Sequence, residues 1–474
     1  MHYPFDIPAI EDDASVENKC NPCKKHDMTG ISLPTERPEN WQQEAVNIFG
    51  ELLDHYKELR VFMDSCVRCG NCTAACQFFL GTGDPKNMPV ARAELMRKVY
   101  RRYFTLSGKL FPNAEGASEF TEEVLDEWKT YFYQCSECRR CATYCPYGID
   151  TGQITMAARE IMARIGVATK YATEVVHKVY LTGNNLGIWP AAWVDSCEFL
   201  EEELKEETGL DIKLPVDVKG ADVLLVAPSA DNFANVDTMM GYAKMFHAAG
   251  ISWTTSTYAD EGGNFGMFLN YWNQKRINQR IVKGAKELGV KTIIWGECGH
   301  AWRAAFPFTN TFNAGMSDFD PPYPKHVCEL TYDLLKQGAF KIDKSANDDV
   351  TVTMHDPCNV ARGANATLRK GMFEWPREMI KMTCNNFIEM HPDCIREKTY
   401  CCGGGGGMLA DEIMPLRMAG GKPRAEACRA TGANFLATPC AICKANLPEV
   451  MSHHKVDVQV GGIHDLFSKA LVLK

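Results

Sequence analysis

The chain has 474 residues, enough for two to four domains with hydrophobic cores of their own. Its net charge is −9 and it contains no long basic run, which excludes an ordinary nucleic-acid-binding surface. The start, MHYPFDIPAIEDD, lacks the basic and apolar regions of a signal peptide, and no apolar run approaches the ~18 residues of a membrane span. We therefore expect any membrane role to depend on a partner subunit.

Cysteine is the unusual part of the composition, with 21 residues in the chain. Disulfide scaffolds are usually short secreted proteins, whereas this chain is long and shows no export signal. In a reducing compartment, regularly spaced cysteines are more often metal ligands. The spacing of the cysteines therefore predicts where metal sites lie.

Residues 1–55 are polar, contain proline and show weak periodicity, which predicts an N-terminal extension. The extension contains one CxxC pair, Cys20 and Cys23, in CNPCKKH. Lys24 follows the pair, so it does not match the CxxCH motif of c-type haem attachment. An extra metal site and a pair of ordinary thiols are both compatible with this pattern.

Residues 56–165 are predicted to form a mostly helical domain around two identical cysteine patterns. CVRCGNCTAAC and CSECRRCATYCP both follow C-x2-C-x2-C-x3-C, the spacing of ferredoxins with two [4Fe–4S] cubes. In those proteins, three cysteines of one run bind one cube and the fourth binds the other cube. Zinc sites usually use CxxC pairs instead, so we expect two cubes that transfer single electrons. The first cube is expected on Cys66, Cys69, Cys72 and Cys145, and the second on Cys135, Cys138, Cys141 and Cys76.

A helix is expected between the two cysteine runs, over residues 92–104, because apolar residues recur there at helical spacing. Its other face is either solvated or docks an acidic partner. Residues 166–215 are interpreted as a helical linker. The basic residues of the polar face are Arg97, Lys98, Arg101 and Arg102.

From about residue 216, short apolar runs alternate with helical stretches, which predicts an α/β architecture. The pattern repeats, since TTSTYADEGGNFGM resembles REKTYCCGGGGGM, and KTIIWGECGHAW resembles ANFLATPCAICK, both at a shift of 142 residues. We therefore predict two tandem modules with parallel sheets, over residues 216–337 and 345–474. Only the second module has a full cysteine set, whereas the first retains Cys298.

Five cysteines of the second module follow predicted strands, in TVTMH, REKTY and FLATP. Parallel strands end at the same edge of a sheet, so these thiols should converge. Five thiols are too many for tetrahedral zinc and one more than a cube needs. The five are Cys358, Cys401, Cys402, Cys440 and Cys443.

Five consecutive glycines follow Cys402, at a high cost in backbone entropy. We interpret them as a loop on which a bulky group lies, with backbone amides that point at it. A strained disulfide between Cys401 and Cys402 and a phosphate-binding loop are the alternatives. The phosphate loop is disfavoured because Met408 and Leu409 follow the glycines, in place of lysine and serine or threonine.

The pattern C…CCG…C-x-x-C resembles the cysteine-rich CCG domain of heterodisulfide reductase catalytic subunits. The resemblance implies that the five cysteines hold a non-cubane [4Fe–4S] cluster, made of two fused iron–sulfur fragments. The expected fold class is then α+α/β, with a mostly helical, ferredoxin-like domain for two [4Fe–4S] clusters before two tandem CCG modules. The first module would be degenerate and bind no cluster of its own.

Three further stretches look like the K subunits of the membrane-bound Dsr complexes of dissimilatory sulfur metabolism, namely FLGTGDPKNMPVARAELMRKVYR (79–101), CPYGIDTGQITM (145–156) and LTGNNLGIWP (181–190). This resemblance implies an oxidoreductase that cleaves a disulfide or trisulfide with electrons from the quinone pool. It implies a peripheral position on the cytoplasmic side of the membrane, held by a membrane subunit with b-type haems, beside further electron-transfer subunits. The implied substrate is a small sulfur-carrier protein of the DsrC type, with C-terminal cysteines, in dissimilatory sulfite or sulfate reduction.

Cleavage of an S–S bond needs protons as well as electrons. His355 and His300 are candidate donors beside the catalytic cysteines, since a histidine with an ordinary pKa near ~6.5 exchanges protons at neutral pH. Each could instead be a structural hydrogen-bonding group. Arg362 either orients a carboxylate of the substrate or lies on the surface. The loop 260–266 of the first module either lines the substrate pocket or is structural.

Two other functions are compatible with most of these motifs. The iron–sulfur subunits of glycolate, lactate or glycerol-3-phosphate dehydrogenase systems also join two cubes to CCG modules, although residues 79–101 and 181–190 argue against them. The other alternative is a non-catalytic electron-transfer subunit. The fifth thiol argues against it, because a simple electron carrier needs only four.

Overall fold

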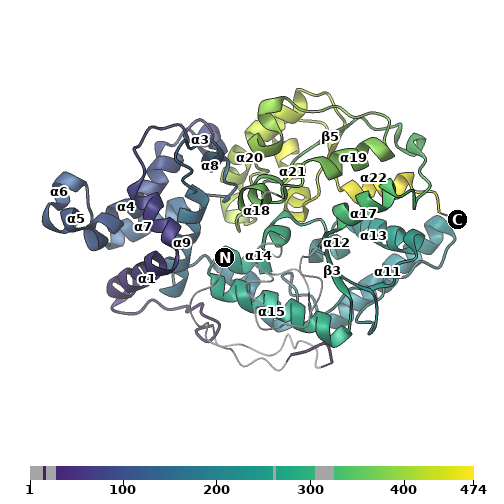
Figure 1. Ribbon diagram of the computed structural model, residues 1–474, viewed down its shortest axis with the longest axis horizontal. Helices are drawn as coiled ribbons and strands as arrows, with labels where there is room; N and C mark the ends of the chain where they lie inside the picture. Colours follow the sequence, from purple (N-terminus) through teal and green to yellow (C-terminus); the bar gives the residue numbers. More distant parts are fainter. Residues whose placement is uncertain (1–13, 18–27, 260–262, 305–324, 369, 474) are drawn as a thin grey trace.

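The computed structural model describes residues 14–17, 28–259, 263–304, 325–368 and 370–473. Figure 1 shows a helical part at one end of the long axis and a larger part, with sheets and helices, at the other. Cys20, Cys23 and Asp260 lie outside the described residues. Within the described residues, no helix combines the length and the apolar character needed to cross a membrane.

The helical part is built around α9 (Thr151–Arg164), which is buried along almost its whole length. Asp150 caps this helix by accepting a hydrogen bond from Gln153 N at 3.2 Å. The helix predicted over residues 92–104 is confirmed as α4 (Pro89–Phe104), which starts at a proline suited to the first helical position and packs on α9. The other elements are α1 (Trp41–His55), α2 (Lys57–Asp64), α3 (Gln77–Thr82), η1 (Pro85–Asn87), α5 (Leu106–Leu110), α6 (Pro112–Glu115), α7 (Glu122–Phe132) and α8 (Arg140–Thr143).

The first sheet is parallel, with strand order β2-β1-β3-β4. Its strand β1 (Val223–Val226) has the sequence VLLV and is buried throughout, as expected for a parallel strand that is covered on both faces. The predicted parallel α/β architecture is confirmed here. The other elements are α10 (Lys170–Thr182), α11 (Pro190–Thr208), α12 (Ser229–Phe233), α13 (Val236–Ala249), β2 (Trp253–Thr254), α14 (Gly263–Met267), α15 (Tyr271–Leu288), β3 (Thr292–Trp295), β4 (Lys325–His326) and α17 (Val327–Lys336).

The second sheet is also parallel, with strand order β5-β6-β7. Cys358 follows β5 and Cys440 follows β6, so both lie at the carboxyl edge of the sheet, as predicted. The elements are η2 (Lys344–Asn347), β5 (Val352–Met354), η3 (Asn359–Gly363), α18 (Ala364–Leu368), α19 (Glu374–Thr383), η4 (Pro392–Cys394), η5 (Arg396–Lys398), η6 (Asp411–Ile413), α20 (Met414–Arg429), β6 (Phe435–Ala437), α21 (Ala441–His453), β7 (Gln459–Gly461) and α22 (Ile463–Ala470).

The strand predicted in REKTY is wrong, because the 3₁₀ turn η5 occupies that segment. Arg396 has a φ of 51°, outside the extended region. Its N–H donates to Asp356 Oδ2 at 2.8 Å, which fixes the turn and removes a donor that a strand would need. Cys401 and Cys402 therefore reach the edge of the sheet from a loop.

The helical part contacts the second module through α3 and α20, which are adjacent in Figure 1. Gly81 of α3 faces the backbone of α20, and Gly420 of α20 faces the ring of Phe78. A Cβ atom on Gly81 would lie 2.0 Å from Ala419 O. The helices can cross this closely only because the two facing positions carry no side chain.

A methyl group at this crossing should force the two helices apart. We expect Gly81→Ala to lower the stability of the cluster-loaded protein by about 1–3 kcal/mol, since the added Cβ meets a backbone oxygen that cannot rotate away. Thermal unfolding measures the effect. The matched control is Leu80→Ala on the same helix, where the side chain is exposed. Equal unfolding midpoints for the two variants would contradict this account of the interface.

Candidate metal centres

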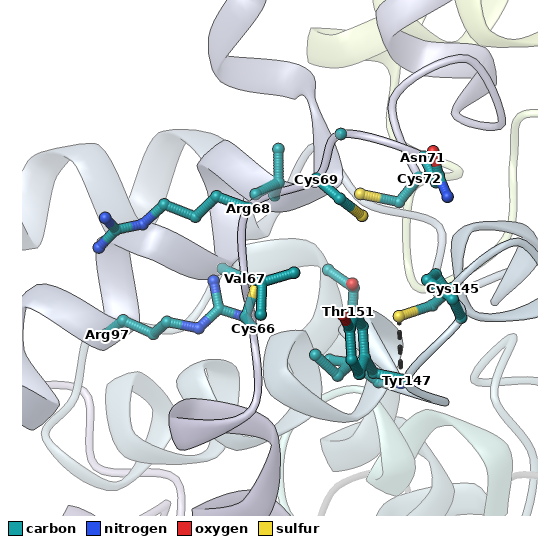
Figure 2. Close-up of a pocket in the computed structure, with 15 residues that line it drawn as sticks. Cys66, Val67, Arg68, Cys69, Asn71, Cys72, Arg97, Cys145, Tyr147 and Thr151 are labelled. Atoms are coloured by element: carbon teal, nitrogen blue, oxygen red, sulfur yellow. Dashed lines mark hydrogen bonds between the residues drawn. The ribbon is translucent and has the colours of Figure 1, made fainter.

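Four thiols surround one pocket in the helical part, as Figure 2 shows. Three come from the loop between α2 and α3, and the fourth follows α8. Burial raises the pKa of the Cys72 thiol to about 11, so a bound cation is needed to hold it as a thiolate. The structure thus brings together the set predicted for the first cube, Cys66, Cys69, Cys72 and Cys145.

Arg97 of α4 lines the same pocket. Its side chain is 2% exposed, and Figure 2 shows the guanidinium directed toward Cys66. The expectation of a solvated or partner-binding face is therefore wrong for Arg97. Arg101, one turn further along the helix, instead pairs with Glu94 at 2.7 Å.

The set predicted for the second cube also comes together, from the start of α3, the loop before α8 and α8 itself. Burial raises the pKa of Cys141, and the charges of Cys138, Cys135 and Cys76 raise it further, which shows that the four thiols are close neighbours. Arg92 lies beside them, since its charge opposes the rise in pKa that burial causes at Cys76. The helix α4 therefore places one buried arginine against each group of four thiols.

The five cysteines of the second module converge in the interior, and all five are buried. Cys358 precedes the π-helix η3, a type of turn that is frequent at functional sites. Cys440 is the N-cap residue of α21, and Cys443 lies in the first turn of that helix. The convergence that parallel strands predict is therefore observed, with Cys401 and Cys402 added from their loop.

The glycine run lies between the five-cysteine group and the loop of the second group. Gly403 N donates to Cys401 Sγ at 3.4 Å, as expected of amides that point at the bound group. Gly406 has a φ of 66°, and a Cβ atom there would lie 2.8 Å from the carbonyl carbon of Ser136. Glycine is thus required here for close approach to a second loop of the chain as well.

The second and third groups adjoin at Cys138. Its side chain packs against the five-cysteine group, and a hydrogen bond with Cys401 raises its pKa well above the ordinary value. Arg362 holds this junction, with Nε donating to Cys138 O at 2.8 Å and Nη1 to Thr399 O at 2.9 Å. Arg362 is buried, so the alternative of a surface position is wrong.

Both candidate histidines lie at the five-cysteine group and are buried. His355 Nε2 is 3.4 Å from Cys443 Sγ. Burial, followed by the charge of Arg424, lowers the pKa of His355 well below its ordinary value, which disfavours the protonated form that an ordinary histidine partly adopts at neutral pH. His300 Nε2 accepts a long hydrogen bond from Gly406 N at 3.5 Å.

The module without the cysteine set nevertheless lines the third group. His300 and Gly299 both follow β3 of the first sheet. A Cβ atom on Gly299 would lie 3.5 Å from Cys440 Sγ, so the backbone of the first module touches a candidate ligand. This contact favours a lining role over a purely structural one.

The buried arginines are the residues that sequence reasoning missed. Helical periodicity assigns arginine to the solvated face, so it gives no signal for Arg92 or Arg97. Their position between two cysteine runs was the one available clue, because thiolate groups need positive charge nearby when they are buried.

The donor sets fit iron–sulfur clusters. The three groups contain four, four and five thiols, and thiolates are the ligands that iron–sulfur clusters use. Buried N–H donors lie around the thiols and can donate hydrogen bonds to sulfur. Within the described residues, Arg97 Nε and Arg362 Nη2 are buried without a hydrogen-bond partner in the protein. A bound sulfur-rich group would supply the missing acceptors.

Comparison with known proteins agrees with this arrangement. A family described as 4Fe-4S dicluster domain matches residues 62–149, and one described as cysteine-rich domain matches residues 352–448. The chain is 43% identical to the Hdr-like menaquinol oxidoreductase iron-sulfur subunit 2 of Archaeoglobus fulgidus, over 92% of this chain and 84% of the relative. A counterpart in Archaeoglobus profundus is 44% identical over the same shares.

A more distant relative is one of the subunits of the dihydromethanophenazine:CoB–CoM heterodisulfide reductase of Methanosarcina mazei. It is 26% identical, over 87% of this chain and 95% of the relative. The resemblance to heterodisulfide reductase subunits is therefore confirmed over most of the chain. We conclude that this chain belongs to the Hdr-like iron–sulfur subunits, oxidoreductase subunits that combine a 4Fe–4S dicluster domain with a cysteine-rich domain.

Proposed function

We propose that this chain cleaves an S–S bond within a membrane-associated complex. Two electrons and two protons convert a disulfide or trisulfide into two sulfhydryl products. The observation that carries the proposal is the convergence of five buried thiols at one place, one more than a simple electron carrier needs. These are the proposed ligands of a non-cubane [4Fe–4S] cluster, and the two groups of four are the proposed ligands of two cubes.

The spatial order of the groups supports an electron path from the surface to the interior. Cys69 of the first group is exposed, whereas all five thiols of the third group are buried. Cys138 of the second group packs on the third, so the second group lies next to the proposed reaction site. When bound, the clusters would supply one-electron steps along this path and an iron with affinity for substrate sulfur.

The chain's own residues have three tasks in this proposal. The buried walls exclude water from the third group, and Arg362 fixes the second group against it. His300 interacts with Cys440 and His355 lies 3.4 Å from Cys443 Sγ, and these two histidines are the proposed proton donors. For His355, the lowered pKa favours the neutral imidazole, which can hydrogen-bond to a thiol but is a weak acid, so His355 would deliver a proton only after its ring has taken one up.

The names of the relatives support the donor and the acceptor that we propose for the path. They are subunits of a menaquinol oxidoreductase and of a heterodisulfide reductase. We propose that a quinol-oxidising membrane subunit with b-type haems delivers the electrons here, among further electron-transfer subunits, and holds the chain on the cytoplasmic side. The proposed substrate is a DsrC-type sulfur carrier with C-terminal cysteines, in dissimilatory sulfite or sulfate reduction.

A spectroscopic experiment separates this function from simple electron transfer. A thiol product added to the oxidised, anaerobic holoprotein should generate a new paramagnetic signal at the five-cysteine site, because product sulfur binds there. Cys358→Ser should lack the signal and retain both cubes. A wild-type protein that shows no thiol-dependent signal would point to an electron carrier. If the native complex copurified with a flavin dehydrogenase and not with a sulfur carrier, the proposal that the substrate is a sulfur carrier would be contradicted.

A further inference from the structure

Arg97 is buried at the first group of cysteines with part of its hydrogen-bonding capacity unused. Its Nη2 makes one long hydrogen bond, to Phe62 O at 3.4 Å. Its Nη1 lies 3.7 Å from Glu94 Oε2, beyond hydrogen-bond distance. Within the described residues, neither Nε nor Nη1 has a hydrogen-bond partner in the protein. A buried N–H without an acceptor is costly, so this geometry suits a site in which the acceptor is a bound group.

The cysteine thiols are the acceptors that the guanidinium of Arg97 faces in this pocket. Figure 2 shows the guanidinium directed toward Cys66, in the space that Cys69, Cys72 and Cys145 also face. Sulfur atoms of thiolates, and of any cluster they hold, accept hydrogen bonds from such donors. Arg97 is therefore placed to donate to sulfur at the first group.

Two neighbouring arginines use their donors differently, although Arg92 also carries its charge beside the thiols of the second group. Arg92 lies on the same helix, but its Nε donates to Tyr131 O and its Nη2 to Asn87 Oδ1, both at 2.8 Å. Arg68 is at the rim of the pocket and is 57% exposed. Figure 2 shows its side chain extending away from the cysteines, where it pairs with Glu94 at 2.9 Å.

We propose that Arg97 tunes the first cube, by donating hydrogen bonds to its sulfur atoms and by placing a buried positive charge beside it. The inference rests on the proposed function, which assigns a [4Fe–4S] cube to these four cysteines. An added electron increases the negative charge of a cube by one, so a nearby cation and N–H donors stabilise the reduced form. Arg97 therefore raises the reduction potential of the first cube above the value that this cube would have without the arginine.

This placement matters because the first cube is the one nearest the surface. Cys69 is exposed, so a redox partner can approach this cube more closely than the other two groups. A raised potential makes it a better acceptor for an electron from a weakly reducing donor such as a quinol. Arg97 is thus a positioning residue for electron entry and has no contact with the proposed S–S substrate site.

Redox titration of the anaerobic holoprotein, followed by electron paramagnetic resonance, tests the proposal. In Arg97→Met, the potential of the first cube should fall, while that of the second cube stays unchanged as an internal reference. Arg68→Met is the matched control, since it removes one positive charge from the rim of the same pocket, and both potentials should stay unchanged. Cys69→Ser, which alters an exposed ligand, identifies the signal of the first cube.

Results that refute the role of Arg97 differ from results that refute the proposed function of the chain. An unchanged first potential in Arg97→Met, or an equal shift at both cubes, would overturn the role of Arg97. If the methionine variant does not retain the first cube, Arg97→Lys decides, because lysine keeps the charge and loses the forked donors. A fall in the first potential of Arg97→Lys, relative to the unsubstituted chain, supports the proposal, and no fall overturns it. A wild-type protein with one cube would refute the cluster assignment instead.

Discussion

Replacing Cys401 and Cys402 together with serine should abolish S–S bond cleavage and leave both cubes in place. Both thiols are buried in the five-cysteine group, and serine is a poor ligand for iron there. We expect the iron content of anaerobically prepared protein to fall from about twelve to about eight atoms per chain, the content of two cubes. Reduction of a disulfide or trisulfide substrate by a reduced dye should drop to background, which iron analysis and a turnover assay measure in parallel.

The control for this variant is another buried thiol of the same module. Cys428 of α20 packs against the five-cysteine group but lies outside the predicted ligand set. Cys428→Ala should keep the full iron content and the turnover rate within a few-fold of the unsubstituted chain. Turnover that survives in the double serine variant, or a native content of only about eight irons, would remove the basis of the proposed reaction.

Local spacing is what made the two groups of four thiols predictable from sequence. Two identical C-x2-C-x2-C-x3-C runs fix three thiols each by short loops, and the exchange of the fourth cysteine follows from the ferredoxin pattern. The structure groups Cys145 with the first run and brings Cys76 to the second. The five-cysteine group could also be predicted from the sequence, because two of its segments follow parallel strands that must end at one edge of the sheet.

The parts that were not predictable depend on contacts between distant segments. The turn at Arg396 forms because the carboxylate of Asp356, about 40 residues earlier, accepts a hydrogen bond from its N–H. The residues of REKTY do not reveal this distant contact. The burial of Arg97 and Arg362 follows from the packing of cysteine loops that lie far away in the chain. Periodicity reports which face of an element is apolar, but it cannot show that a charged side chain has a buried partner.

A buried ionic network joins the two α/β modules behind the five-cysteine group. Lys444, next to Cys443, donates to Asp231 Oδ1 at 2.8 Å and lies 3.6 Å from Glu297 Oε2. Both carboxylates belong to the first module and are fully buried. Glu297 also accepts from His464 of the second module, with the ring nitrogen at 2.7 Å. Lys444 is thus the cation that lets two buried carboxylates lie at the interface.

Lys444→Met should therefore separate the modules. Removing one partner of a buried ion pair costs about 3–5 kcal/mol, because the remaining charge is left uncompensated. We expect the apparent melting temperature to fall by on the order of 10 °C. Iron should be lost from the third site first, since His300 and Gly299 of the first module contact that group. Thermal unfolding followed by cluster absorbance measures both effects.

The pH dependence of this variant identifies the cause of its instability. Burial raises the pKa of Asp231 to about 6, and Lys444 limits that rise, so the pKa should rise further in Lys444→Met. A carboxyl with a raised folded-state pKa favours folding when protonated, and that contribution is lost as the pH rises through the folded pKa. The stability deficit of the variant, relative to the unsubstituted chain, should therefore grow as the pH rises above about 6, and Asp231→Asn should restore part of the stability. The matched control is Lys244→Met, because Lys244 is also buried but pairs at 2.6 Å with Glu207, whose side chain is 53% exposed and can be solvated when the lysine is removed. That pair should contribute no more than about 1 kcal/mol, and a deficit equal to that of Lys444→Met would contradict the account.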